Sequence, residues 1–297
     1  MTILITGIDG QLGQALYKAY SGVQDILGLN RNQFNLENFD YCRDLILDKK
    51  PKWIINTAAF TNVNMAEIEK EKAFKINSYG PANIVKAAST YGGKVIHISS
   101  DFVFDGINKN SYKPEDKCNP VNIYGLSKYK GEKLIIKYPN VIILRTSWLY
   151  GPIGKNFCLT ILKMSKLFSK EKKTLKVVSD QIGCPTSSIN LAEICWAFKN
   201  IYSNDEFSSE IFHWCNSGFT SWYDFAKSII ELGLEYGLLS QEVKLLPIKA
   251  KQYNSKAKRP YFSLLDCEKT RKLLKIDQVY WKDSLREVIK LIRNEDL

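Results

Sequence analysis

The chain has 297 residues, of which 45% are hydrophobic and 25% are charged, a balance typical of folded globular proteins. This composition excludes a disordered polymer, a collagen and a small disulfide-stabilised scaffold. No apolar run approaches the roughly 18 residues that a membrane span requires, and the first seven residues lack the basic and long apolar regions of a signal peptide. The sequence therefore predicts a cytoplasmic protein with no membrane partner.

Lys and Arg outnumber Asp and Glu by 42 to 31, which gives a formal net charge of +11. The positive charges are dispersed, and the chain lacks the basic groove with aromatic residues that nucleic-acid binding uses. We therefore expect anionic small molecules, not nucleic acid, as partners. The seven cysteines are scattered without a C-x-x-C pair, which predicts free thiols and no metal site.

Short β-branched and apolar runs predict strands, and apolar residues at helical spacing predict helices between them. The predicted strands are 2–6, 23–29, 53–57, 94–100 and 141–145. The predicted helices are 11–20, 36–47, 66–91 with an interruption at Gly80 and Pro81, one that begins at Asn119 as its N-cap, 157–167, 189–201 and 221–232.

Strands that alternate with helices are typical of an α/β fold with a Rossmann-type, doubly wound parallel sheet. We expect this sheet in residues 1–150, as a dinucleotide-binding domain. The looser pattern of residues 151–297 predicts a smaller mixed α/β lobe that binds substrate, with some segments packing back on the sheet. Ligands should then lie at the carboxyl ends of the strands.

Gly7, Gly10 and Gly13 follow the first predicted strand and open the first predicted helix. Glycines in this context allow a tight turn and a close approach of the backbone to a pyrophosphate, and the helix N-terminus offers free N–H groups. Gln11 and Leu12 would supply some of these groups. The motif predicts a dinucleotide site, and the alternative is a tight turn without a ligand.

The second predicted strand is followed by Asn30 and Arg31, where NAD sites commonly hold the ribose with an acidic residue. Asn30 can still bind a ribose hydroxyl, and the planar guanidinium of Arg31 suits a 2′-phosphate. The sequence therefore favours NADPH as cofactor, with NADH as the alternative. The competing interpretation of Arg31 is an ordinary surface residue.

Tyr124 and Lys128 are four residues apart, which places them on one face of a helix. A neighbouring ammonium would lower the pKa of the Tyr124 phenol from its usual value of about 10, and Tyr124 could then protonate a carbonyl oxygen as hydride reaches the carbon. Ser100, at the end of the fourth predicted strand, could donate to the same oxygen, with Ser99 as its competitor. We predict Ser100, Tyr124 and Lys128 as the catalytic set.

Three further side chains could contact a substrate. Asp101 could accept from sugar hydroxyls, Trp148 could stack on a base or shield a sugar from water, and Arg259 could pair with a diphosphate. The alternative interpretations are that Asp101 caps a turn, that Trp148 is a core aromatic residue, and that Arg259 is a surface arginine. His97 and His213 lie in apolar strand contexts, which favours satisfied core residues.

With these elements in place, the chain resembles the dTDP-4-dehydrorhamnose reductase family of extended short-chain dehydrogenase/reductases along nearly its whole length. The segments that carry the resemblance, besides the glycine turn, are 56–64, 99–106, 119–128, 144–151, 178–186, 221–225 and 259–263.

The resemblance implies contacts for individual residues. At the cofactor it places Gly10, Gln11 and Leu12 at the pyrophosphate, Asn30 at the adenosine ribose, and Asn35 and Leu36 near adenine. It places Ala58, Ala59 and Thr61 near the ribose and nicotinamide. At the substrate it places Val63 beside the sugar, and Asp101 and Trp148 at the sugar nucleotide. Ser100 and Phe102 stand where the family has Thr and Tyr. Asn30 and Asn35 replace acids, which weakens an NAD assignment, and the exact sugar stays open.

The activity implied is reduction of the C4 keto group of a nucleotide-linked 6-deoxyhexose, most specifically of dTDP-4-dehydro-L-rhamnose to dTDP-L-rhamnose, a precursor of cell-surface polysaccharide. The alternatives are a reductase or epimerase of another nucleotide sugar, and a catalytically silent NADP-binding regulatory subunit. The family includes metal-dependent dimers, so a homodimer is an open expectation. The sequence has no carboxylate cluster that predicts the metal.

Overall fold

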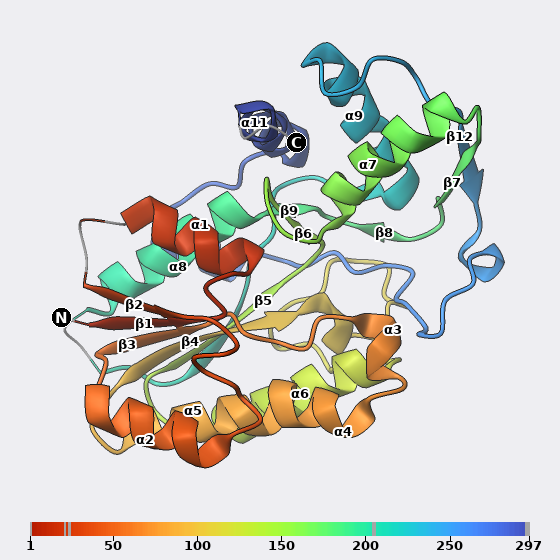
Figure 1. Ribbon diagram of the computed structural model, residues 1–297. Helices are drawn as coiled ribbons and strands as arrows, with labels where there is room; N and C mark the ends of the chain where they lie inside the picture. The colour runs from red at the N-terminus through yellow and green to blue at the C-terminus, as the bar shows by residue number, and fades with distance from the viewer. Residues whose placement is uncertain (1, 21, 23–24, 204–205, 295–297) are drawn as a thin grey trace.

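The computed structural model describes residues 2–20, 22, 25–203 and 206–294, and Figure 1 shows a sheet with helices on both faces and a smaller lobe beyond one end of its strands. The main sheet has six strands, which all run parallel. In order across the sheet they are β10 (Glu210–His213), β5 (Val141–Thr146), β4 (Lys94–Ser100), β3 (Trp53–Asn56), β1 (Ile3–Thr6) and β2 (Ile26–Leu29). The predicted α/β class with a doubly wound sheet is confirmed.

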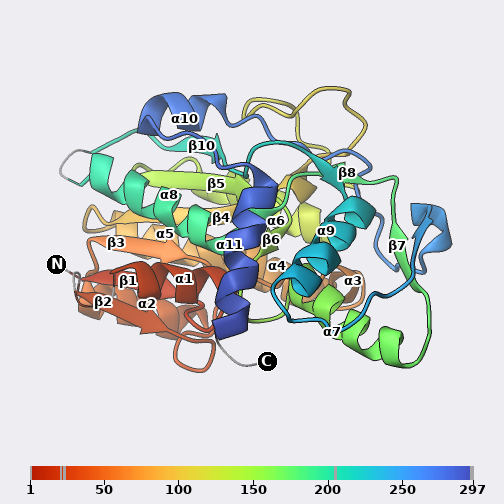
Figure 2. The same cartoon turned by 90° about the horizontal axis from the view of Figure 1, so that it is seen from above.

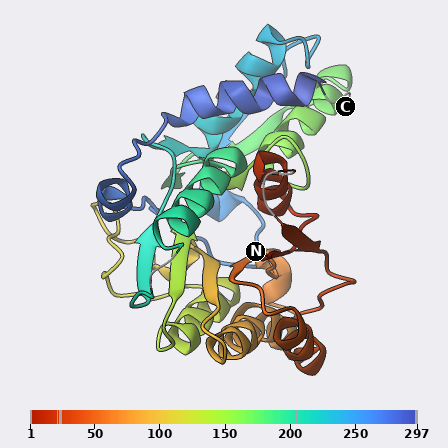
Figure 3. The same cartoon turned by 90° about the vertical axis from the view of Figure 1, so that its left-hand side faces the viewer.

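The strands are covered on both faces, which explains why their sequences read as nearly continuous apolar runs. Every residue of β1 is buried. Because side chains alternate along a strand, Ile3 and Ile5 belong to one hydrophobic core and Leu4 to the other. The sheet therefore separates two cores, one beneath each layer of helices (Figure 3).

Two layers of helices enclose this sheet. Helices α1 (Gln11–Tyr20) and α8 (Ser188–Ile201) lie side by side over one face, as Figure 2 shows from above. The opposite face carries α2 (Phe39–Lys49), α5 (Gly80–Ser89) and α6 (Ile123–Ile135). Because α8 follows residue 150 in the chain, the second half contributes to the layer that covers the first half.

The long helix predicted over 66–91 is broken in the structure. Its place is taken by α3 (Val63–Ala66), α4 (Lys70–Phe74), a π-helix (Lys75–Tyr79) and α5. Within the π-helix, the Asn77 side chain binds the backbone N–H and C=O of Phe60 and the hydroxyl of Ser127. The chain continues through Gly80, and Pro81 lies in the first turn of α5. At this position the N–H that proline lacks would have no hydrogen-bond partner within the helix.

The predicted start of α6 is wrong by three residues. The N-cap is Asn122, whose side chain accepts from the N–H of Gly125 at 2.8 Å, and the helix begins at Ile123. Asn119 instead donates its backbone N–H to the carbonyl of Val103. Both asparagines are good caps by residue type, so the cap is decided by the path of the preceding loop. Of the second predicted strand, residues 23 and 24 lie outside the described residues, and β2 begins at Ile26.

The smaller lobe is built mainly from residues after 148. Its strands are β6 (Leu149–Tyr150), β7 (Leu175–Val178), β8 (Ile182–Gly183), β9 (Thr186–Ser187), β11 (Thr220–Ser221) and β12 (Leu245–Ile248), in three two-stranded sheets. Its helices are α7 (Phe157–Lys170), α9 (Trp222–Glu235), the 3₁₀ turn Ala250–Gln252 and α11 (Trp281–Asn294). Helix α10 (Glu268–Leu274) instead packs on β10 of the main sheet and on α8. Within the described ranges, no helix is long and apolar enough to cross a membrane.

Candidate active site

A cleft of about 720 Å³ lies between the carboxyl ends of the main strands and the smaller lobe. Most of the predicted site residues line it. Those that do so are Gly7, Gly10, Gln11, Leu12, Arg31, Asn35, Leu36, Ala58, Ala59, Thr61, Val63, Ser100, Asp101, Phe102, Tyr124, Lys128, Trp148 and Arg259. Gly13 and Asn30 are not among its lining residues.

The glycine turn depends on two close approaches of the backbone. Gly7 has φ of +70°, and its carbonyl accepts the N–H of Gly10 at 2.9 Å. A Cβ on Gly13 would lie 2.3 Å from the Gly7 carbonyl oxygen, so Gly13 allows α1 to pack under the turn and does not face the cleft. Gln11 Oε1 is buried without a hydrogen-bond partner among the described residues. A tight turn at the start of α1, whose first backbone N–H groups have no acceptor within the helix, fits a dinucleotide pyrophosphate.

Asn30 is not among the residues that line the cleft, and its contact with the ribose stays a prediction. Its side-chain oxygen accepts the N–H groups of Asn32 and Gln33 at 3.0 and 3.1 Å, and so closes the turn after β2. Arg31 does line the cleft, with a side chain that is 68% exposed and 3.3 Å from Glu37. An exposed pair of this kind is weak, which leaves the guanidinium available to a phosphate.

Tyr124 lies in the first turn of α6, against the end of β4. Its ring meets the edge of Phe102 with centroids 5.5 Å apart. Burial raises the pKa of Tyr124 to about 12, although a hydrogen bond with Ser100 acts in the opposite direction. The sequence predicts that Lys128 lowers the pKa of Tyr124, whereas in the structure this pKa is raised. The Lys128 amine donates to the Ile98 carbonyl and not to the phenol. The phenol is therefore held protonated at neutral pH, as a proton donor must be.

The amine of Lys128 is turned toward β4. Nζ donates to the carbonyl of Ile98 at 2.6 Å and lies 3.2 Å from His97 Nε2. Burial lowers the pKa of Lys128 to about 8, while the carboxylate of Glu132, one turn further along α6, acts to raise it. Lys128 is thus a buried amine that changes its protonation close to physiological pH.

Ser99 and Ser100 have different partners. The Ser99 hydroxyl donates to Glu132, which also forms a buried ion pair with Arg145 at 2.7 Å. The Ser100 hydroxyl donates to Asp101 Oδ1 at 3.0 Å. It also forms a hydrogen bond with the Tyr124 phenol. The geometry therefore favours Ser100 over Ser99 as the hydroxyl beside Tyr124.

Two charged side chains mark the end of the cleft beyond Tyr124. Burial raises the pKa of Asp101 to about 7, although hydrogen bonds from Ser263 and Ser100 act to lower it. Arg259 Nε is buried and has no partner among the residues that the structure describes. A buried carboxyl and an unpaired guanidinium N–H suit a ligand with hydroxyl and anionic groups.

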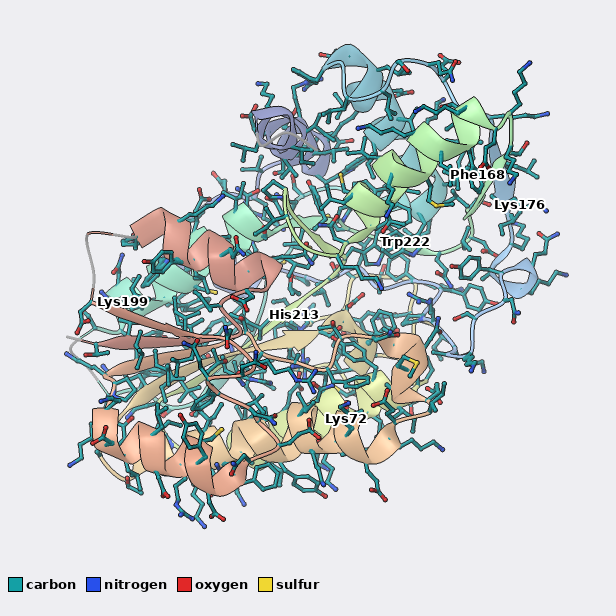
Figure 4. All side chains as sticks on the ribbon, in the orientation of Figure 1. Lys72, Phe168, Lys176, Lys199, His213 and Trp222 are labelled. Carbon is teal, nitrogen blue, oxygen red and sulfur yellow. The ribbon has the colours of Figure 1, made fainter. Side chains whose placement is uncertain are left out.

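A stacked tryptophan pair forms part of the wall on the side of the smaller lobe. The rings of Trp148 and Trp222 are parallel within 6°, with centroids 3.5 Å apart. Trp148 has φ of +46°, an uncommon conformation for a large residue. Trp222, labelled in Figure 4, and Lys155 line the cleft but were not singled out from the sequence. The stack joins residues 74 positions apart, a pairing that local spacing does not reveal.

The remaining sequence expectations concern core residues. His97 and His213 are both buried, and burial lowers the pKa of His213 to about 3. His213, labelled in Figure 4, ends the edge strand β10. All seven cysteines are free thiols, as predicted.

Comparison with known proteins agrees with this architecture. The family model described as the RmlD substrate binding domain matches residues 1–294. A dTDP-4-dehydrorhamnose reductase of Aggregatibacter actinomycetemcomitans is 35% identical over 290 residues, which cover 96% of this chain and 97% of that protein.

Two solved structures are also similar over almost the whole chain. A dTDP-4-dehydrorhamnose reductase from Clostridium acetobutylicum has a TM-score of 0.89 at 35% identity and covers 99% of this chain and 100% of its own. One from Bacillus anthracis, in complex with NADP, has a TM-score of 0.87 at 31% identity and covers 98% and 99%. The chain belongs to the RmlD substrate binding domain family.

Proposed function

We propose that this chain is an NADPH-dependent reductase that converts the C4 keto group of dTDP-4-dehydro-L-rhamnose to a hydroxyl. The observation that carries the proposal is one cleft lined both by the glycine turn and by Ser100, Tyr124 and Lys128. The names of relatives that match nearly the full chain support the same reaction.

The cofactor end of the cleft suits NADPH. The turn from Gly7 to Leu12 would hold the pyrophosphate, and Arg31 would pair with the 2′-phosphate. The bound NADP of the Bacillus anthracis relative supports this choice over NADH. We assign contacts with the remaining parts of the cofactor to Asn35, Leu36, Ala58, Ala59, Thr61 and Lys128. NADPH, when bound, supplies the hydride.

The protein's own residues supply the proton. The Tyr124 phenol, protonated because burial raises its pKa, donates to the carbonyl oxygen as negative charge develops there. The Ser100 hydroxyl donates to the same oxygen and stabilises that charge. We assign Lys128 to the ribose of the cofactor, which it would reach from the inner side of α6.

The substrate end suits a sugar nucleotide. Asp101 would accept from sugar hydroxyls, and Val63 and Phe102 would border the sugar. Trp148 would stack on the ligand or shield the sugar from water. Arg259 would pair with the diphosphate. We also propose that residues 1–150 form the dinucleotide-binding domain and that residues 151–297 supply most of the substrate lobe. The cytoplasm stays the predicted compartment, and a homodimer stays an expectation.

The test is oxidation of NADPH, followed by nicotinamide absorbance, with dTDP-4-dehydro-L-rhamnose as substrate. We expect turnover by the native chain, a loss of at least about a hundredfold in Tyr124→Phe, and unchanged NADPH affinity in that variant. Tyr129→Phe, on the same helix but outside the cleft, is the matched control and should stay active. A folded chain that binds NADPH but leaves this sugar unreduced would overturn the proposal and favour another nucleotide sugar or a silent subunit.

A further inference from the structure

A row of buried polar side chains runs behind Lys128, on the side away from the cleft. Lys128 Nζ lies 3.2 Å from His97 Nε2, and His97 Nδ1 lies 2.9 Å from the Asn56 amide nitrogen. The Thr6 hydroxyl donates to Asn56 Oδ1 at 2.7 Å. None of the four residues is more than 1% exposed, so their polar atoms need hydrogen-bond partners within the protein.

The sheet itself aligns this row. Thr6 is the register partner of Asn56 between β1 and β3, and Asn56 is the register partner of His97 between β3 and β4. Neighbouring residues in register present their side chains on the same face of a sheet. The row therefore follows from strand pairing, and it connects the strand before the glycine turn to the catalytic helix.

The hydrogen bonds in the row have a direction. The backbone N–H of Ala58 donates to the Thr6 hydroxyl at 3.4 Å, and this hydroxyl donates to the Asn56 oxygen. The Asn56 amide then presents its N–H to His97 Nδ1. Complete burial holds the pKa of His97 well below its usual value, so the ring is neutral and carries one proton. With Nδ1 as the acceptor, that proton lies on Nε2, facing Lys128.

A ring N–H aimed at the lysine nitrogen discriminates between its two protonation states. The neutral amine can accept this hydrogen bond through its lone pair and still donate to the Ile98 carbonyl. The ammonium has no lone pair, so His97 and Lys128 would then face each other as two donors. The His97 contact therefore favours the neutral amine.

The other charged and titratable groups around Lys128 are few among the described residues. Glu132 on α6 favours the ammonium, but its carboxylate is already paired with Arg145 from β5. Tyr124 and Asp101 lie toward the cleft. The π-helix packed on α6 presents Asn77 and Ser78 to Ser127, and neither side chain titrates.

We propose that His97 is a positioning residue that holds the Lys128 nitrogen and, through a tautomer fixed by Asn56, favours the neutral form of the amine. The proposal rests on the role of Lys128 in the proposed function. A lysine that readily exchanges a proton at the cleft suits a reaction in which Tyr124 has to be reprotonated after each turnover.

The tautomer can be measured without turnover. The sequence has only two histidines, His97 and His213, so a long-range ¹H–¹⁵N spectrum of histidine-labelled protein is readily assigned with a His213→Gln variant. We expect the native His97 ring to carry its proton on Nε2 and to lose this preference in Asn56→Leu. A native ring protonated on Nδ1 would overturn the proposal even if the sugar is reduced as proposed.

The pH profile of kcat/KM for NADPH tests the consequence. Because an ammonium donates more strongly to a ribose hydroxyl than a neutral amine does, kcat/KM should fall as pH rises through about 8. In Asn56→Leu the ring is free to accept from the ammonium, and in His97→Gln the amide oxygen can do so. Both should move this alkaline limb of the profile to higher pH by about one unit.

Ile55→Val, a buried change beside Asn56 that removes one methylene, is the control for altered packing and should leave the limb in place. Thermal unfolding of all three variants identifies any that fail to fold. An alkaline limb that does not move in two folded variants would show that His97 has only a structural role. Absence of turnover in the native chain would overturn the proposed function, while the tautomer measurement would still decide the role of His97.

Discussion

Burial acts in opposite directions on the acidic and basic residues of the cleft, because it disfavours whichever form is charged. It raises the pKa of Tyr124 and of Asp101, and it lowers the pKa of Lys128. A protonated phenol is the form that a reduction consumes, since the carbonyl oxygen must gain a proton. The same site would be poorly prepared to start the reverse oxidation, which needs the phenolate.

We predict that Asp101, as a proposed contact of the sugar, makes substrate affinity depend on pH. Below about pH 7 its carboxyl becomes protonated and is a weaker acceptor for sugar hydroxyls, whereas above that pH the carboxylate binds them fully. We expect KM for the sugar nucleotide to rise as the pH falls below 7, and Asp101→Asn to give a higher KM that no longer depends on pH. Initial rates across this range would check it, and a pH-independent KM in the native chain would contradict it.

We predict that Arg31, as the proposed contact of the 2′-phosphate, decides between the two nicotinamide cofactors. Removing its guanidinium in Arg31→Ala should weaken NADPH binding about tenfold or more, because a charge-assisted contact with the 2′-phosphate is lost. NADH affinity should change little. Arg43→Ala, which removes an exposed arginine outside the cleft, is the control. Equal losses for the two cofactors, measured by fluorescence titration, would exclude a 2′-phosphate contact.

Individual site residues can be predicted from the sequence where the motif that contains them spans only a few positions. The glycine turn and the Tyr124–Lys128 spacing are contained in a few positions. The hydrogen bonds of Asn30 to its own turn are less evident from the sequence, because a short polar side chain after a strand can bind either the turn or a ligand. The contact between His97 and Lys128 joins positions 31 apart on a strand and a helix, so it depends on how α6 packs on the sheet.

Among the elements, the strands were predicted best because their burial on both faces gives continuous apolar runs. The segment from 63 to 89 was predicted worst. Its amphipathic spacing persists through four consecutive helical elements, but the Asn77 side chain binds Phe60 and Ser127 where the helix widens. Hydrophobic spacing does not report such side-chain-to-backbone bonds.

The two asparagines before α6 give a direct test of the corrected helix start. Asn122→Ala removes the cap bond to Gly125 and a bond to the Lys258 carbonyl at 2.7 Å, and should lower the free energy of unfolding by about 1–2 kcal/mol. Asn119→Ala should change it by about 0.5 kcal/mol or less. Urea denaturation of both variants would check this, and a larger loss in Asn119→Ala would contradict the corrected cap.

In the whole molecule, residues before and after position 150 belong to the same main sheet and to the same hydrophobic core. β10 pairs with β5 and completes the main sheet. Glu132 and Arg145 form a buried pair, each 2% exposed, and Arg145 also contacts His213 of β10 at 3.3 Å. One continuous hydrophobic core extends from Ile3 in the first strand to Trp281 in α11.

A shared core predicts that the two parts unfold together. Tryptophan fluorescence, which reports Trp53 in the sheet as well as Trp222 and Trp281 in the smaller lobe, should give the same thermal midpoint as far-UV circular dichroism. Because the cleft takes residues from both parts, bound NADP should raise this single midpoint, with about 2.7 kcal/mol of stabilisation at 100 times its Kd. Two separate midpoints, or a shift confined to one of them, would show that the smaller lobe folds on its own and that the cleft forms only when the two parts dock.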